Sequence, residues 1–170
     1  VNALSEWVEV ENCRDGKKYT ERFERGAVAR PFKCVGDSDG RHGLYVRFKP
    51  DATIFEETVF EYNTLLTRMR EQSFLNAGVK IILRDERPGI EQEQILHYEG
   101  GIKSFVSHLN AAKHAGLIHQ SVIYMKATKG DITAEVAMQY NDSYNEALLT
   151  FANNINTIEG GTHVAGFRAA

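Results

Sequence analysis

The first third of the chain alternates apolar and polar side chains in the manner of antiparallel strands. In the clearest run, every second residue is apolar: Leu44, Val46 and Phe48. A period of two places these side chains on one face, so the run predicts a half-buried strand that Pro50 ends. Asp15-Gly16 predicts a tight hairpin turn, because glycine accepts the positive φ that the turn requires.

Large apolar residues mark the other strands of this region. They are Trp7, Val8 and Val10 before the hairpin turn, Tyr19 and Phe23 after it, and Phe32 and Cys34 in a further strand. Because short links join these strands, we expect them to pair antiparallel.

From Glu56 to Asn76 the spacing of apolar residues changes to that of a helix. Apolar side chains recur at steps of three and four: Val59, Tyr62, Leu66 and Met69. This spacing lines one helix face, and Asn76-Ala77-Gly78 supplies the stop. The apolar run from Val79 to Leu83 predicts a buried strand, followed by a polar loop from Asp85 to Glu93.

The second half predicts a short helix and then a meander. Gly100-Gly101 precedes the helix, whose apolar stripe is Ile102, Phe105, Val106 and Leu109. Three strands with hairpin turns at Lys129–Asp131 and Asn141–Ser143 are then expected. These strands are Val122–Ala127, Ile132–Tyr140 and Ala147–Asn153.

A final helix is predicted after Gly160-Gly161, which permit a sharp entry, with Thr162 as the N-cap. His163, beside this cap, is expected to take part in packing or in a hydrogen-bond network. The predicted fold class is therefore α+β, with antiparallel sheets and a few helices packed on them.

Composition narrows the class of protein without indicating a chemistry. The 170 residues are 42% hydrophobic and 25% charged, with a formal charge of −3. These values are ordinary for one medium domain or two small subdomains, and any nucleic-acid contact must come from a local patch. Cys13 and Cys34 lack a CxxC spacing and are expected to be free thiols. Without a spanning apolar run or a signal peptide, a cytoplasmic protein is expected.

The sequence holds no self-contained catalytic constellation. The six histidines show no HExxH motif and no metal-ligand spacing: His42, His97, His108, His114, His119 and His163. We interpret them as structural or surface residues. Asp37 and Asp39 flank a glycine-rich turn, but the other ligands of an EF-hand loop are missing. No GxSxG, P-loop or GxGxxG motif occurs, so residue chemistry alone predicts no catalyst and no metal site.

Four segments carry a resemblance that changes this interpretation. They are VNALS at 1–5, REQSFLNAG at 70–78, HYEGGI at 97–102 and NNINTIEGGTHVAGFR at 153–168. The last segment closely resembles the NNIxTxEGGTHxxGFR signature of the B subunits of bacterial DNA gyrase and topoisomerase IV, which are type II DNA topoisomerases. The other three resemble that family's VNALS, RLRELAFLNxG and YEGGI segments. The order and spacing fit, so the resemblance covers essentially the whole chain.

The resemblance implies two domains. Residues 1–97 would be the C-terminal part of a GHKL-type ATPase domain. Residues 98–170 would be the N-terminal part of a transducer domain like the second domain of ribosomal protein S5. In this family of isomerases, ATPase domains dimerise on ATP binding and trap duplex DNA. The transducer then passes the nucleotide state to the DNA-cleaving core, which includes the A subunit.

The resemblance also implies that the chain is a piece of a longer B subunit, as do the absence of an initial methionine and the final helix without a stop signal. The family's catalytic glutamate, Mg²⁺-binding asparagine, adenine-reading aspartate and phosphate-sensing lysine have no counterpart in these residues. Phosphoryl chemistry needs metal, base and phosphate donors assembled together. We therefore expect ATP and Mg²⁺ as cofactors of the parent B-subunit homodimer and no ATP turnover by this chain alone.

The resemblance assigns roles to four residues. Arg14 would lie at the rim of the nucleotide pocket, beside the aminocoumarin-binding region; an exposed arginine at a hairpin turn is the alternative. Val46 would line the adenine pocket, which is compatible with a sheet-core valine. Leu44 replaces the family's usual threonine and cannot make its hydrogen bond. Arg168 would face the cavity of the captured duplex; a solvated arginine is the alternative.

Two further interpretations remain open. A stand-alone S5-like module could bind RNA, other nucleic acid or a partner protein, although the chain is polar without being basic. A relic used only for protein contact, for example with the A subunit, is the other. Within the resembled family, gyrase is favoured over topoisomerase IV, but the features that separate the two lie outside this chain.

Overall fold

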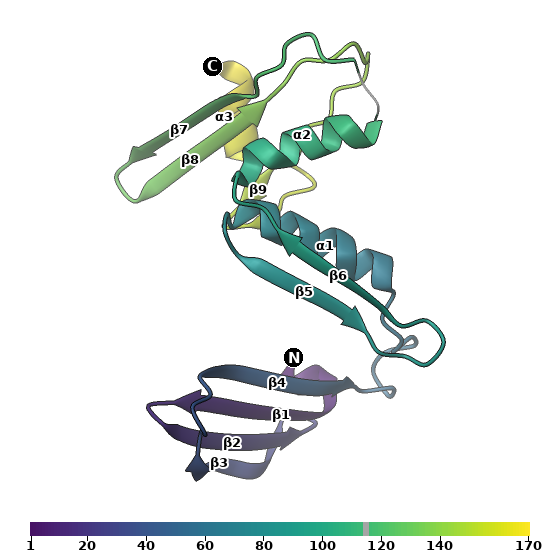
Figure 1. Cartoon of the computed structure of the whole chain (residues 1–170), viewed down its shortest axis with the longest axis vertical. Coiled ribbons are helices and arrows are strands. Elements are labelled where there is room, and N and C mark those ends of the chain that lie inside the picture. Colours follow the sequence, from purple (N-terminus) through teal and green to yellow (C-terminus); the bar gives the residue numbers. More distant parts are fainter. Residues whose placement is uncertain (114–115) are drawn as a thin grey trace. The chain divides into compact units, whose positions relative to one another are not determined.

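The computed structural model describes residues 1–113 and 116–170, so His114 lies outside the described residues. Two compact units, Val1–Phe60 and Glu61–Ala170, divide the chain, and each is described by itself. The described residues form antiparallel sheets and three α-helices, which confirms the predicted α+β class (Figure 1). None of the described helices is long and apolar enough to cross a membrane.

The first unit is a four-stranded antiparallel sheet in the order β3-β2-β1-β4. Its elements are the 3₁₀ helix η1 (Asn2–Leu4) and the strands β1 (Ser5–Arg14), β2 (Lys17–Glu24), β3 (Ala27–Asp37) and β4 (Gly43–Pro50). The predicted hairpin turn is confirmed: Asp15 has φ 52° and Gly16 has φ 74°. Two consecutive residues in the left-handed region match the twist of the flanking strands, so this dipeptide sets the β1–β2 register.

The two faces of this sheet differ in character. Directly paired residues share a face, so Val10 and Val46 lie together, as do Asn12 and Leu44. The face with these valines carries most of the apolar side chains, whereas the opposite face carries ion pairs along β1 and β2. The predicted half-buried β4 is wrong on burial, because Leu44 is 67% exposed. No α-helix among residues 1–60 covers the apolar face.

The second unit contains three α-helices and three two-stranded antiparallel sheets within its described residues. In chain order its elements are α1 (Tyr62–Leu75), β5 (Lys80–Asp85), β6 (Gln92–His97), α2 (Gly101–Lys113), β7 (Ile123–Lys129), β8 (Ile132–Met138), β9 (Phe151–Ala152), β10 (Ile155–Asn156) and α3 (Thr162–Ala169). The strand pairs are β5–β6, β7–β8 and β9–β10. The predicted α2 is confirmed, including its apolar stripe, in which Phe105 is buried.

An aromatic stack forms the core of the second unit. The ring of Phe74, 1% exposed, lies 3.8 Å from that of Tyr98 and 4.7 Å from that of Phe105, measured between centroids. Leu96 on β6 is equally buried. Complete burial of one such side chain stabilises a fold by about 1.5–3 kcal/mol, so this stack holds α1 and α2 together.

The predicted helix from Glu56 is wrong at its start, because α1 begins at Tyr62. Glu61 is the N-cap, and its carboxylate accepts hydrogen bonds from the backbone N–H groups of Thr64 (2.5 Å) and Asn63 (3.1 Å). These hydrogen bonds lower the pKa of Glu61. Val59 followed the apolar period but precedes the cap, so the local cap decided the boundary.

The predicted buried strand from Val79 is wrong in its burial and its surroundings. The strand β5 alternates between exposed and half-buried residues, and Ile82 is 50% exposed. It pairs with β6, which begins at Gln92 inside the segment predicted as a loop. The contacts of α1 with both strands cover one face of this hairpin, which explains the alternation.

The predicted meander of three strands is also wrong, because β7 and β8 form a two-stranded sheet. Asn141 pairs with Leu117 instead of forming a hairpin turn. Within the third predicted strand only Phe151–Ala152 is a strand, and it pairs with Ile155–Asn156. The hairpin turn at Gly130, with φ 59°, is confirmed.

The final helix begins after the two glycines, as predicted, but Thr162 is its first residue and not its N-cap. Gly161 occupies the cap position, without a side-chain hydrogen bond. The predicted division at residues 97 and 98 lies inside the second unit, between β6 and α2. It concerns the domains of a longer protein and stays a prediction.

Candidate functional site

Three of the residues singled out from the sequence lie on the apolar face of the first unit. Val46 pairs with Val10, and Leu44 pairs with Asn12 across β4 and β1. Arg14, two residues beyond Asn12, is the last residue of β1 and therefore shares this face. The fold thus brings Arg14, Leu44 and Val46 to neighbouring positions at one end of the sheet.

These side chains are accessible. Val46 is 47% exposed and Leu44 is 67% exposed, so the two form an open apolar surface. The Arg14 side chain is 72% exposed, with its Nε 3.5 Å from a carboxylate oxygen of Asp15. An apolar surface with a guanidinium at its rim suits a flat, partly polar ring, because guanidinium groups both stack and donate hydrogen bonds.

The structure adds two aromatic residues and an amide that the sequence did not single out as part of this site. Tyr19 on β2 pairs with Asn12 on β1, and the ring of Tyr19 stacks on that of Phe32 with centroids 5.1 Å apart. Asn12 is the polar side chain directly across from Leu44. The alternation around Tyr19 indicated a strand face, but only the cross-strand register shows which residues share the face with Leu44.

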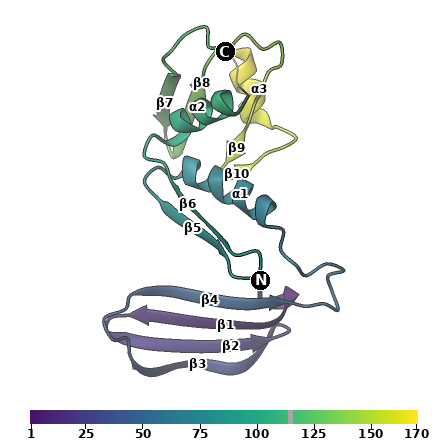
Figure 2. The same ribbon diagram turned by 45° about the vertical axis from the view of Figure 1, so that its right-hand side comes forward.

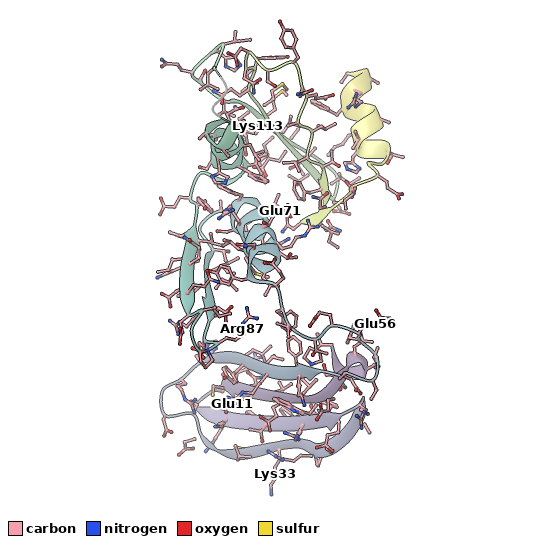
Figure 3. All side chains as sticks on the ribbon, turned by 90° about the vertical axis from the view of Figure 1, so that its right-hand side faces the viewer. Glu11, Lys33, Glu56, Glu71, Arg87 and Lys113 are labelled. Atoms are coloured by element: carbon pink, nitrogen blue, oxygen red, sulfur yellow. The ribbon has the colours of Figure 1, made fainter. Side chains whose placement is uncertain are left out.

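The opposite face of the sheet is occupied by ion pairs. The guanidinium of Arg22 lies 2.6 Å from Glu9, and Glu11 lies 2.7 Å from Lys18 and 3.1 Å from Arg41 (Glu11 is labelled in Figure 3). The hydrogen bond from Lys18 lowers the pKa of Glu11. Partly exposed pairs of this kind contribute little stability each, so this face is a solvated, charge-balanced surface.

Asp51, just after β4, is a buried carboxylate that serves the fold. It is 2% exposed and accepts hydrogen bonds from the Nε of Arg25 (2.6 Å) and from the N–H (2.9 Å) and hydroxyl (2.8 Å) of Thr53. These donors, Arg25 foremost, hold the pKa of Asp51 far below the ordinary aspartate value. A carboxylate engaged in this way joins the β2–β3 turn to the end of β4 and is not placed to act as a base.

Arg168 lies on α3, in the second unit. Its side chain is 58% exposed, and its Nη2 lies 3.3 Å from a carboxylate oxygen of Glu146. The exposure leaves the guanidinium within reach of a polyanion. The loose ion pair with Glu146 is a surface contact that a phosphate could replace.

Two of the described histidines, His119 and His163, take part in hydrogen-bond networks. The Nε2 of His119 accepts a hydrogen bond from the N–H of Tyr140 (3.0 Å), so its Nδ1 donates to the carbonyl of Ser121 (2.7 Å). His163 bonds through Nε2 to the hydroxyl of Thr157 (3.2 Å), which confirms the expected network role. Among residues 1–113 and 116–170, no three His, Cys, Asp or Glu side chains are grouped to hold a metal.

Comparison with known proteins supports the resemblance along the whole chain. The family DNA gyrase B matches residues 101–170. The chain is 51% identical to the DNA gyrase B subunit of Clostridium acetobutylicum, over 100% of the chain and 26% of that protein. In Enterococcus faecalis it is 48% identical to the B subunit of DNA gyrase and 46% identical to the B subunit of DNA topoisomerase 4, covering 26% and 24% of them. The chain thus spans about a quarter of these relatives.

Solved structures extend the similarity to the fold. The 43K ATPase domain of Thermus thermophilus gyrase B, in complex with an aminocoumarin, matches 99% of the chain at 36% identity and a TM-score of 0.85, with 45% of that domain covered. The B subunit of Myxococcus xanthus gyrase matches 98% of the chain at 26% identity and the same TM-score, with 48% covered. The chain therefore belongs to the family of bacterial type II DNA topoisomerase B subunits, represented by the B subunit of DNA gyrase.

Proposed function

We propose that residues 1–170 are a working part of the ATP-operated clamp of a DNA gyrase B subunit, which couples ATP binding and hydrolysis to DNA strand passage and supercoiling. The observation that carries this proposal is the 51% identity to a gyrase B subunit over 100% of the chain. The partners of this clamp are a second B subunit, the A subunit and duplex DNA, in the cytoplasm.

We assign Arg14, Leu44 and Val46 to the adenine end of the nucleotide site. The open apolar surface of Leu44 and Val46 fits one wall for a planar base, with the Arg14 guanidinium at its rim. ATP with Mg²⁺ would supply the phosphoanhydride bond whose hydrolysis drives the clamp. The described residues fit the adenine end of ATP, and among them no three His, Cys, Asp or Glu side chains are grouped to hold a metal ion.

In this proposal the chain binds and relays, and the groups that hydrolyse ATP belong to other segments of the B subunit. Residues 1–97 form the end of the ATPase domain and residues 98–170 the start of the transducer domain. Arg168 faces the captured duplex and offsets phosphate charge without reading sequence, so its contribution is sensitive to salt.

The test uses the full-length B subunit that carries these residues, together with its A subunit, on a relaxed plasmid and separately on a positively supercoiled plasmid. We expect negative supercoiling that requires ATP, and no ATP turnover by residues 1–170 alone. ATP-dependent relaxation of the supercoiled plasmid, without supercoiling of the relaxed one, would assign the chain to topoisomerase IV instead. The absence of any ATP-dependent change in DNA topology would contradict the proposed function, and robust ATP hydrolysis by the 170 residues alone would contradict the assignment of the catalytic groups elsewhere.

A further inference from the structure

Three amide side chains close a hydrogen-bonded ring between the end of α1 and the β9–β10 turn. The Nε2 of Gln72 donates to the backbone carbonyl of Asn154 (2.8 Å), and the Nδ2 of Asn154 donates to the Oδ1 of Asn76 (2.9 Å). The Nδ2 of Asn76 donates to the backbone carbonyl of Gln72 (2.8 Å), which completes the ring. We call Gln72, Asn76 and Asn154 the amide ring. It joins residues 78 and 82 positions apart in the sequence.

The backbone of the turn holds Asn154 in place for these contacts. Asn153 has φ 49° and Asn154 has φ 64°, and the turn connects Ala152 with its partner Ile155. Two successive left-handed residues form the tight turn that two-residue hairpins favour, and asparagine tolerates this region better than other residues with a Cβ. The Asn-Asn pair therefore combines a turn conformation with a side chain that reaches α1.

The amide ring lies beside the aromatic core of the second unit. Phe74, on α1 between Gln72 and the C-cap residue Asn76, stacks on Phe105 of α2, and the ring of Phe105 lies 6.4 Å from that of Phe151 on β9. Figure 2 shows β9 and β10 beside α1. Apolar packing and directional hydrogen bonds thus connect the same elements, and a joint of this kind resists both sliding and rotation.

From the turn, contacts continue to α3. The hydroxyl of Thr157, just after β10, lies 3.2 Å from the Nε2 of His163 in the first turn of α3. Thr150 also bonds to Thr157, with 2.7 Å between their hydroxyl oxygens. A continuous set of contacts therefore leads from the C-terminal end of α1 to the helix that carries Arg168.

We infer that Gln72, Asn76 and Asn154 are positioning residues that transmit displacement of α1 to the β9–β10 turn and on to α3, and so couple nucleotide state to strand passage. This inference rests on the proposed function. Gln72 and Asn76 lie before the predicted division at residues 97 and 98, and Asn154 lies after it, so the amide ring would link the ATPase part to the transducer part. Coupling between the two parts requires a connected structural element whose arrangement both parts influence.

The first test is Asn154→Gly in the full-length B subunit with its A subunit. Glycine keeps the left-handed φ but removes the side-chain bond to Asn76. We expect the number of strand passages per ATP hydrolysed to fall about threefold to tenfold, the equivalent of one hydrogen bond, while basal ATP hydrolysis is unchanged. Asn153→Gly is the matched control, because it keeps the turn and leaves the amide ring intact. An unchanged ratio in Asn154→Gly would overturn the inference, even with a lower melting temperature.

A second measurement separates this inference from the proposed function. Gln72→Ala removes the hydrogen bond to the backbone carbonyl of Asn154. Amide hydrogen exchange of the full-length protein then reports on the contact between α1 and the β9–β10 turn without requiring catalysis. We expect faster exchange both around Asn76–Val79 and around Ile155–Thr157. Faster exchange confined to Asn76–Val79 would show that the amide ring transmits nothing. Faster exchange at both sites without any ATP-driven strand passage would keep the proposed link between α1 and the β9–β10 turn and reject the clamp function.

Discussion

The two compact units reach order by different means. In the first unit the buried apolar residues are only Val8 and Cys13, and Leu44, Val46 and Phe48 on the apolar face of its sheet stay exposed to solvent. In the second unit Phe74, Leu96 and Phe105 are buried, and the aromatic stack joins two helices. Pairing and turn chemistry define the first unit, whereas packing between distant segments defines the second.

This difference indicates where a ligand or a neighbouring element can act. An open apolar face next to a charged rim gains stability from whatever covers it, because burial of apolar surface contributes about 25 cal/mol per Å². A packed core has little more to gain and instead transmits displacement. We therefore expect the first unit to respond to binding and the second unit to relay the response.

The largest expected effect is on the stability of the second unit. Phe74→Ala should lower its free energy of unfolding by about 3–5 kcal/mol, because a buried ring between two others leaves a cavity. Phe48→Ala is the matched control, because Phe48 is 43% exposed on the apolar face of the first unit. This variant should lower the free energy of unfolding of the first unit by a much smaller amount. Amide hydrogen exchange resolved by unit measures both. Equal losses would break the comparison between the units.

The next effect concerns the pH dependence of the first unit. The folded-state pKa of Asp51 is lowered by Arg25 and Thr53, so the stabilisation is complete above the unfolded aspartate value of about 3.9. It is lost as the pH falls through the folded-state value. An acid titration in which amide hydrogen exchange of the first unit is measured at each pH should show this loss of stability. Asp51→Asn should abolish that pH dependence, and an unaltered acid profile in this variant would contradict the assignment.

A smaller effect is expected at the open apolar face. Leu44→Thr in the full-length B subunit should strengthen nucleotide binding about threefold to tenfold, because a hydroxyl restores one hydrogen bond that leucine cannot make. Leu44→Val, which removes bulk without adding a hydroxyl, is the control. Calorimetry with a non-hydrolysable ATP analogue measures the change. An equal increase in nucleotide affinity in both variants would show that the smaller side chain, and not the hydroxyl, is the cause.

The smallest effect is expected at Arg168. Arg168→Gln should reduce DNA-stimulated ATP hydrolysis by about twofold to fivefold at low salt and leave basal hydrolysis unchanged, since one phosphate contact is lost. Lys33, which projects from the edge strand β3, provides a control on the first unit through Lys33→Gln (Figure 3). Equal losses of basal and stimulated rates in Arg168→Gln would reject its role facing DNA.

Much of the first unit could be predicted from its sequence because its contacts are local. The alternation of Leu44, Val46 and Phe48 and the Asp15-Gly16 turn led to the correct strands and hairpin. Their burial could not be predicted, since the same alternation fits a covered or an open face. The positions of Arg14, Leu44 and Val46 follow from register, but their contact with a nucleotide remains a prediction.

The second unit was harder to predict wherever partners lie far apart in the sequence. The expected strand at 147–153 shortened to Phe151–Ala152, which pairs with Ile155–Asn156, whereas β7 and β8 pair only with each other and Asn141 pairs with Leu117. The start of α1 depended on the Glu61 cap, a glutamate whose capping role no apolar period reveals.

The sequence by itself determined the α+β class, the turns at Asp15-Gly16 and Gly130, the helix after Gly160-Gly161 and the family. These features depend on backbone preferences and motifs that a few neighbouring residues carry. Only the tertiary structure decided which apolar faces are covered, how Phe74 comes to lie between Tyr98 and Phe105, and that Asn154 reaches α1. Burial and long-range hydrogen bonds depend on which segments meet in space, and a one-dimensional pattern does not specify that meeting.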